Sequence, residues 1–131
     1  MLKKTLISVI AVFVAWSVLD FVIHGVILKS AYEATANLWR PMNEMKMNVM
    51  HMAVLIASFT FVWIYARFIS NKSIATGLKY GLWWGLGAGV SMGYGTYAVI
   101  PIPYLMALVW FLGSFAEGAT AGLIVGGIVK E

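Results

Sequence analysis

Long apolar runs separated by short polar breaks organise the whole chain. The runs cover about residues 5–28, 48–69, 74–100 and 104–129. Each has the roughly 20 residues that an α-helix needs to cross about 30 Å of hydrocarbon. Stretches such as LISVIAVFVAW lack the in-and-out alternation of membrane β-strands. The pattern therefore predicts an all-α fold, a polytopic four-helix transmembrane bundle that forms a single membrane domain over residues 1–131.

Composition supports the same class of protein. Hydrophobic residues make up 62% of the 131 residues and charged residues 11%, and the mean hydropathy is +0.89. A soluble domain of this size buries only about 60 to 70% of its unfolded surface, so it could not hide this much apolar area. We therefore expect a lipid bilayer to cover the rest. The opening MLKK and the apolar run after it are also typical of a signal peptide, but the length of the run favours a retained first span.

The basic residues predict an orientation. The connections on one side of the predicted membrane hold the larger set: Lys3, Lys4, Arg67, Lys72, Lys79 and Lys130. The other side holds Lys29, Arg40 and Lys46. Because lysine and arginine are enriched in cytoplasmic loops, both termini should be cytoplasmic, and the connections at 29–47 and 100–104 should face outward. The expected location is the cell membrane, as a multi-pass protein of a bacterial inner membrane.

Several function classes are excluded by what the sequence lacks. The chain has no cysteine, which rules out disulfides, thiolate zinc sites and iron–sulfur clusters. Its net charge of +4 is spread over the connections, so no nucleic-acid partner is expected. The segment GLGAGVSMG follows no strand and is a membrane glycine face rather than a phosphate loop. No nucleophile motif predicts a catalytic residue either.

Small residues recur at every fourth position in the last two predicted helices. The third helix has Gly77, Gly81, Gly85, Gly89 and Gly93, with Gly87 and Gly95 in addition, and the fourth has Ser114, Gly118, Gly122 and Gly126. Helices in lipid associate through small residues that let their backbones approach. The pattern therefore predicts close packing of these two helices, with each other or across a homo-oligomer interface. A glycine-lined pore is the less favoured interpretation.

Three ionisable residues fall inside the predicted spans: Asp20, His24 and Glu117. A charged group at such a position costs from about 2.5 kcal/mol upward, so each of them raises a functional question. Asp20 and His24 are four residues apart and should lie on one helix face. A carboxylate and an imidazole at this spacing can bind a metal ion together or hydrogen-bond to each other.

The segment RPMNEMKMNVMHM, residues 40–52, adds further candidate ligands. Pro41 suits the first turn of a helix, which predicts that the second helix begins near residue 41 and continues into the membrane. Glu44, Met47 and His51 would then share one stripe. The other methionines point around the helix and are interpreted as lipid-facing or core residues rather than as thioether ligands of Cu(I).

These observations lead to a site hypothesis. Asp20, His24, His51 and Glu117 are predicted to converge on a cavity open to the outer side, with Glu44, and Glu33 as a further candidate, at its mouth. Two imidazoles and two carboxylates suit Fe, Zn or Mn, and Met47 would favour Cu. The preferred function is therefore the binding or transport of a transition-metal ion.

Four other interpretations remain open. The buried polar residues can be hydrogen-bonded pairs that fix helix register. The protein can be a non-catalytic accessory or interaction subunit of a larger membrane complex or of a homo-oligomer. It can be a proton- or ion-coupled transporter that uses Glu117. A metal-dependent membrane enzyme would use the same ligands with an open coordination position, and is less favoured.

Overall fold

A computed structural model describes residues 1–130, and all its regular elements in that range are helical. Two segments continue from α-helix into π-helix: α1 (Leu2–Asp20) into η1 (Phe21–Ile27), and α4 (Ile74–Gly89) into η4 (Val90–Tyr94) and then α5 (Gly95–Val99). The other long helices are α3 (Met47–Phe68) and α6 (Tyr104–Ile128). Short helices fill the connection between η1 and α3: α2 (Lys29–Ala34), η2 (Ala36–Leu38) and η3 (Met42–Glu44). The prediction of a helical fold is confirmed.

Three of these helices are long and apolar enough to cross a membrane: Leu2–Ile27, Met47–Phe68 and Tyr104–Ile128. Their surfaces also expose apolar side chains, among them Ile10, at 65% of its area, and Phe21, at 69%. Such apolar helix surfaces suggest a membrane protein. The helical segment from Ile74 to Val99 is not one of the three, and its glycines, tyrosines and tryptophans add little hydropathy.

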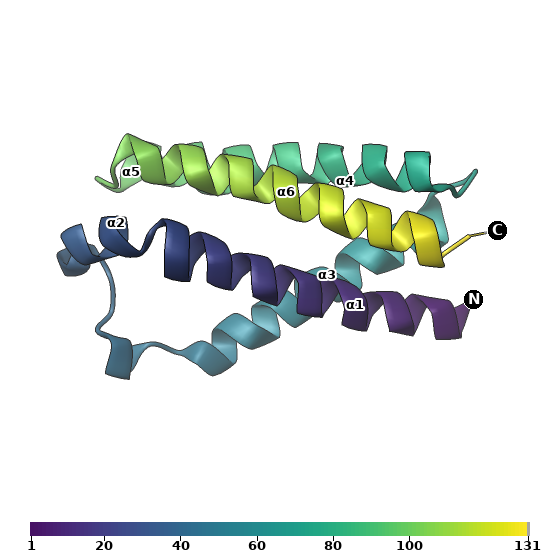
Figure 1. The fold of residues 1–131 in the computed structure, drawn as a ribbon, viewed down its shortest axis with the longest axis horizontal. Coiled ribbons are helices and arrows are strands. Elements are labelled where there is room, and N and C mark those ends of the chain that lie inside the picture. Colours follow the sequence, from purple (N-terminus) through teal and green to yellow (C-terminus); the bar gives the residue numbers. More distant parts are fainter. Residues whose placement is uncertain (131) are drawn as a thin grey trace.

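The long helices run side by side, and α3 crosses them at a steep angle (Figure 1). The described ends of the chain and the turn between α3 and α4 lie at one end of the molecule. The connection that contains α2, η2 and η3 lies at the opposite end, together with the turn between α5 and α6. We call these the terminal end and the connection end.

Helices α4 and α6 approach each other at their glycines. A Cβ atom added to Gly85 would lie 2.6 Å from the main-chain oxygen of Ser114, and one added to Gly93 would lie 2.6 Å from that of Ala107. Added Cβ atoms on four further glycines would meet the facing backbone even more closely: Gly77, Gly81, Gly118 and Gly122. A Cβ on Gly87 or Gly95 would meet nothing within 4 Å. The backbones of the two helices therefore touch along one face of α4.

The main core joins α1, α3 and α6. Its fully buried side chains include Val12, Phe61, Val62, Tyr65 and Val125. Helix α4 is tied to this core by the Tyr80 hydroxyl, which donates to the Phe61 carbonyl at 2.7 Å. A second apolar cluster lies toward the connection end and contains Ile23, Leu28, Ile102, Met106 and Ala107. The candidate residues Asp20, on α1, and Glu117, on α6, lie where these two helices face each other, and α6 contributes to both clusters.

The predicted start of the second long helix near residue 41 is wrong. Residues 42–44 form a single 3-10 turn, after which Met45 has an extended backbone, with φ −68° and ψ 134°. Helix α3 begins at Met47, without a side-chain hydrogen bond from its N-cap residue, Lys46. Pro41 precedes the 3-10 turn as its N-cap rather than opening a long helix. Glu44 is consequently not on the same helix as His51.

Candidate functional site

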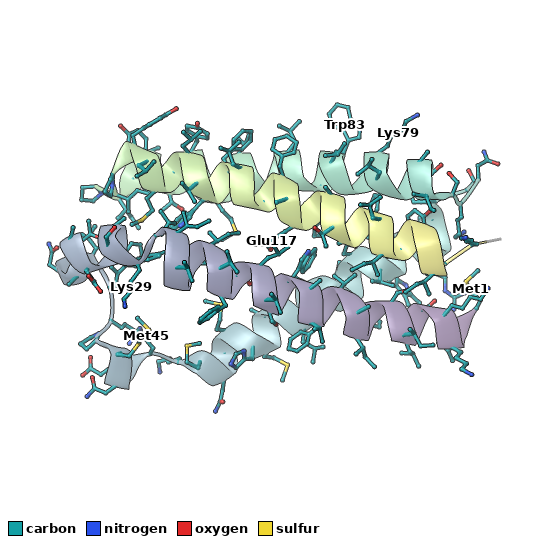
Figure 2. All side chains as sticks on the ribbon, in the orientation of Figure 1. Met1, Lys29, Met45, Lys79, Trp83 and Glu117 are labelled. Atoms are coloured by element: carbon teal, nitrogen blue, oxygen red, sulfur yellow. The ribbon has the colours of Figure 1, made fainter. Side chains whose placement is uncertain are left out.

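The carboxyl groups of Asp20 and Glu117 form the centre of the candidate site. Asp20 is the last residue of α1 and Glu117 lies in the middle of α6. The two side chains are partly buried, and a side-chain hydrogen bond joins them. Figure 2 shows Glu117 between the α6 and α1 ribbons, near the middle of the molecule. A hydrogen bond between two carboxyl groups needs a proton on one of them, because an ionised carboxylate can only accept.

Trp16 holds the helices in position around this pair. Its indole Nε1–H donates to the main-chain carbonyl of Glu117 at 2.8 Å, and the ring is 5% exposed. The same ring packs edge-on against Phe61 of α3, with 5.5 Å between the ring centroids. One buried side chain on α1 therefore contacts both α6 and α3, one turn before Asp20.

A second polar contact begins at His24, within the π-helix η1. Asp20 lies close enough to act electrostatically on the His24 ring. The Nδ1 atom of His24 lies 2.6 Å from the hydroxyl oxygen of Tyr32. In turn, the Trp110 indole donates to that hydroxyl oxygen at 3.0 Å. Polar groups thus continue from Glu117 through Asp20 and His24 to Tyr32, at the connection end.

The hydrogen bonds of Tyr32 suit either protonation state of His24. Because the phenol oxygen accepts from Trp110, its own proton is free to be donated to Nδ1 of a neutral imidazole. When Nδ1 carries a proton, the direction reverses and the phenol oxygen accepts from both rings. The arrangement can therefore accommodate a proton on either side of this contact without a change of partners.

Tyr32 itself lies outside the membrane-length helices, and its surroundings favour the neutral phenol. Burial raises the pKa of Tyr32 above its usual value near 10, and the negative charge of Asp20 raises this pKa further. The hydrogen bond from Trp110 acts in the opposite direction and lowers it. Tyr32 should thus remain a neutral donor and acceptor at physiological pH.

An aromatic cluster covers the connection end of the polar contacts. The Trp39 ring packs against Tyr32, with 5.3 Å between centroids, and against Trp110, with 6.2 Å between them. Trp39 is held by a hydrogen bond from its Nε1–H to the Thr35 hydroxyl at 2.9 Å. Residues 29–39 therefore form a strap, which we define as α2, η2 and Trp39, that packs beside His24 and leaves its ring exposed.

The π-helix η1 is the local backbone feature that accompanies this site. In it, the amide of Leu28 donates to the carbonyl of Ile23, five residues earlier, at 2.9 Å. Such wide turns occur mostly as short interruptions of α-helices and are frequent at functional sites. Here the wide turn follows directly after Asp20 and contains His24.

The other predicted ligands lie elsewhere. His51 is exposed on α3, in the part of the helix before its first buried residue, Ser58. Met47 is 49% exposed, and Glu44 and Glu33 are exposed in the short helices of the connection. Within residues 1–130, no three His, Asp or Glu side chains are grouped closely enough to hold a metal ion. The metal-ligand assignment therefore stays a prediction, and the carboxyl pair with His24 is the part that comes together.

Sequence reasoning missed three residues of this site: Trp16, Tyr32 and Trp110. Tyr32 and Trp110 are 78 positions apart in the sequence, so no periodicity connects them. Trp16 did have a signal, because it lies four residues before Asp20 and therefore on the same helix face.

The comparisons with known proteins identify no relative of the chain. No family model matches it, no curated protein is significantly similar to it, and no solved structure shares its fold at a significant level.

Proposed function

We propose that this protein is a membrane-embedded proton or cation carrier whose binding site is the carboxyl pair of Asp20 and Glu117. The observation that carries the proposal is the side-chain hydrogen bond between these two groups within a bundle of apolar helices. Two adjacent carboxylates in apolar surroundings repel each other and lose hydration, so the pair gains by holding a proton or a small cation between its oxygens. Ionisable groups within membrane helices typically mark ion or proton pathways.

The membrane arrangement that we propose has four spans, with both termini in the cytoplasm. The helical backbone from Ile74 to Val99 supports a fourth span, since at about 1.5 Å per residue it measures roughly 40 Å. Its glycine contacts with α6 support its insertion beside that helix, because small residues drive helix association in lipid. The excess of lysine and arginine near the terminal end supports the orientation.

In this arrangement, the connection end faces outward and the polar contacts lead from it to the carboxyl pair. Because His24 is exposed, its ring can take up a proton from the outer side, and Tyr32 stays hydrogen-bonded to the ring in either protonation state. Asp20 interacts with both His24 and Glu117, so it lies between them on the proposed path. The proposed steps are therefore His24 to Asp20 and Asp20 to Glu117. The last group lies near the middle of the molecule.

A flux measurement tests the proposal. The protein is reconstituted into liposomes that contain a pH-sensitive dye, and a potassium diffusion potential drives proton entry. Wild type should acidify the lumen, whereas Asp20→Asn and Glu117→Gln should reduce the rate by about tenfold or more, as expected when a positioned proton-transfer group is lost. Glu44→Gln is the matched control, because it removes an exposed carboxylate outside the long helices.

A second measurement separates proton sharing from transport. Infrared difference spectra between wild type and Glu117→Gln should show the carbonyl stretch of a protonated carboxylic acid in wild type, because a carboxyl–carboxyl hydrogen bond needs one. If flux is equal in wild type and in both variants, the carrier role is wrong. If the protonated acid band is also absent, the binding site itself is wrong.

A further inference from the structure

A shallow groove lies on the side of the α4–α6 pair that faces away from α1. It has a volume of about 280 Å³ and is lined by Lys79, Leu82, Trp83, Leu86 and Phe115. Three of the lining residues follow Lys79 on α4 by three, four and seven positions: Leu82, Trp83 and Leu86. These four side chains therefore form one stripe along the helix. Figure 2 shows Lys79 and Trp83 projecting from α4 on the same side, away from α1.

The groove combines one cation with apolar walls. Lys79 is exposed, and Trp83 is exposed over 72% of its area. No acidic residue occurs in the sequence of α4. The carboxyl group of Glu117, two positions after Phe115, is directed toward Asp20 instead. The positive charge at the groove is therefore not balanced by a carboxylate of either lining helix.

Lys79 is suitably placed for a lipid headgroup. It follows the start of α4 by five residues, or roughly 7.5 Å along the helix axis. A lysine at this depth can extend its ammonium group to the membrane surface while its methylenes cover apolar neighbours. Trp83 and Leu86 lie one and two turns deeper, where acyl chains run.

We infer that this groove binds one anionic phospholipid, with the headgroup phosphate on the Lys79 ammonium and an acyl chain along Trp83, Leu86 and Phe115. Charge complementarity selects the headgroup, because a zwitterionic lipid carries its own cation beside the phosphate. Anionic lipids are attracted to basic residues near the membrane surface. Other lysines at the terminal end raise the local concentration of anionic lipid, but only Lys79 lines the groove. The inference does not depend on the carboxyl pair.

Trp83 provides the probe for an experiment. The protein is reconstituted into vesicles of equal parts phosphatidylglycerol and phosphatidylcholine, with bromine, a contact quencher of indole fluorescence, on the acyl chains of one lipid at a time. The Trp83 signal is the difference between wild type and Trp83→Phe. Brominated phosphatidylglycerol should quench it with about fivefold preference over brominated phosphatidylcholine, as expected for one lysine near the membrane surface.

Two variants make the result specific. Lys79→Gln should abolish the preference, whereas Lys79→Arg should retain it because the charge is kept. Lys3→Gln removes the same charge from the first turn of α1, outside the groove lining, and it should leave the preference unchanged. Equal quenching by both lipids in wild type would overturn the inference, as would an equal loss of preference in Lys3→Gln and Lys79→Gln. A second copy of the chain in the groove would shield Trp83 from both lipids and appear as a dimer in cross-linking, which would also overturn it.

Discussion

Trp16 donates its indole N–H to the main-chain carbonyl of Glu117 at 2.8 Å, across the interface between α1 and α6. The bond fixes the position of Glu117 along the axis of α1. The Glu117 side chain therefore meets Asp20, which lies one turn after Trp16. A register shift of one residue would rotate Glu117 by roughly 100° around α6. The alignment of the carboxyl pair therefore depends on a residue that carries no charge.

This relationship predicts the effect of Trp16→Phe. The variant keeps an aromatic ring but loses the donor, and it should lower the free energy of unfolding by about 1 to 3 kcal/mol through the lost hydrogen bond and the smaller ring. It should also weaken proton flux, because the carboxyl groups are less well aligned. Denaturant titration in detergent micelles and the liposome assay measure the two effects. Trp83→Phe is the control, since the Trp83 ring is largely exposed; equal destabilisation by both variants would contradict the prediction.

The glycines of α4 allow a matched comparison within one helix. Gly85→Ala places a methyl group against the Ser114 backbone, whereas Gly87→Ala places one in open space. Overpacking typically costs about 1 to 3 kcal/mol. A Gly→Ala change without a clash gains up to about 1 kcal/mol from helix propensity. Thermal unfolding in detergent should therefore show opposite shifts for the two variants, and shifts of the same sign and size would refute a packing role for this face.

The ionisation of Tyr32 should respond to its neighbours in a defined direction. Burial and Asp20 raise its pKa and the Trp110 hydrogen bond lowers it. Asp20→Asn should consequently lower the pKa of Tyr32, and Trp110→Phe should raise it. The titration is followed by ultraviolet absorbance. Each protein is compared with the same protein carrying Tyr32→Phe in addition, so that the difference reports this one phenol. Shifts opposite in sign to these would show that the contacts of Tyr32 are not those described.

The orientation can be tested directly because the chain has no cysteine. Asn37→Cys lies in η2 at the connection end, and Ser70→Cys lies in the turn before α4, and both positions are exposed. With the termini in the cytoplasm, a membrane-impermeant maleimide added outside intact cells should label residue 37 and leave residue 70 unlabelled until the cells are broken. The reverse labelling pattern would invert the proposed orientation.

The metal-ligand assignment makes a separate prediction. If Asp20, His24, His51 and Glu117 are ligands, purified wild type should contain stoichiometric metal, and both His24→Ala and His51→Ala should lose it at matched folding. Elemental analysis by mass spectrometry measures this. Loss of metal in His24→Ala alone would restrict the ligands to the residues around the carboxyl pair. Absence of metal in wild type would remove the metal-ligand assignment without affecting the proton-binding proposal.

The apolar pattern of the sequence located the helices well. The predicted span 104–129 corresponds to α6 within one residue at each end, and the apolar run 48–69 ends within one residue of α3, because uninterrupted apolar runs leave little freedom in where a helix lies. The start of α3 was harder to predict. Pro41 is compatible with several turn types, and the break at Met45 and Lys46 has no glycine or proline to mark it. The stripe that joined Glu44 to His51 failed for this reason.

The candidate site was only partly readable from the sequence. The spacing of Asp20 and His24 could be interpreted within one helix, and Glu117 was evident as a charge in an apolar run. Tyr32 and Trp110 approach each other only because the strap folds back over η1, which is a long-range contact without a local signal. The pairing of Asp20 with Glu117 likewise depends on how α1 packs against α6, which helical phase permits but does not determine.

The π-helix η1 also has a consequence for changes in chain length. A wide turn of this kind contains one more residue than an α-helical turn over the same rise. Deleting Val22 should let the segment relax into a regular α-helix with its apolar character intact. Because the wide turn already absorbs the extra residue, the residues that follow would keep their direction relative to α1, with His24 still near Asp20 and Tyr32 still beside Trp110. A single-codon deletion at the wide turn should therefore leave the strap next to the carboxyl pair, whereas the same deletion within the regular turns of α1 would rotate everything after it by roughly 100°.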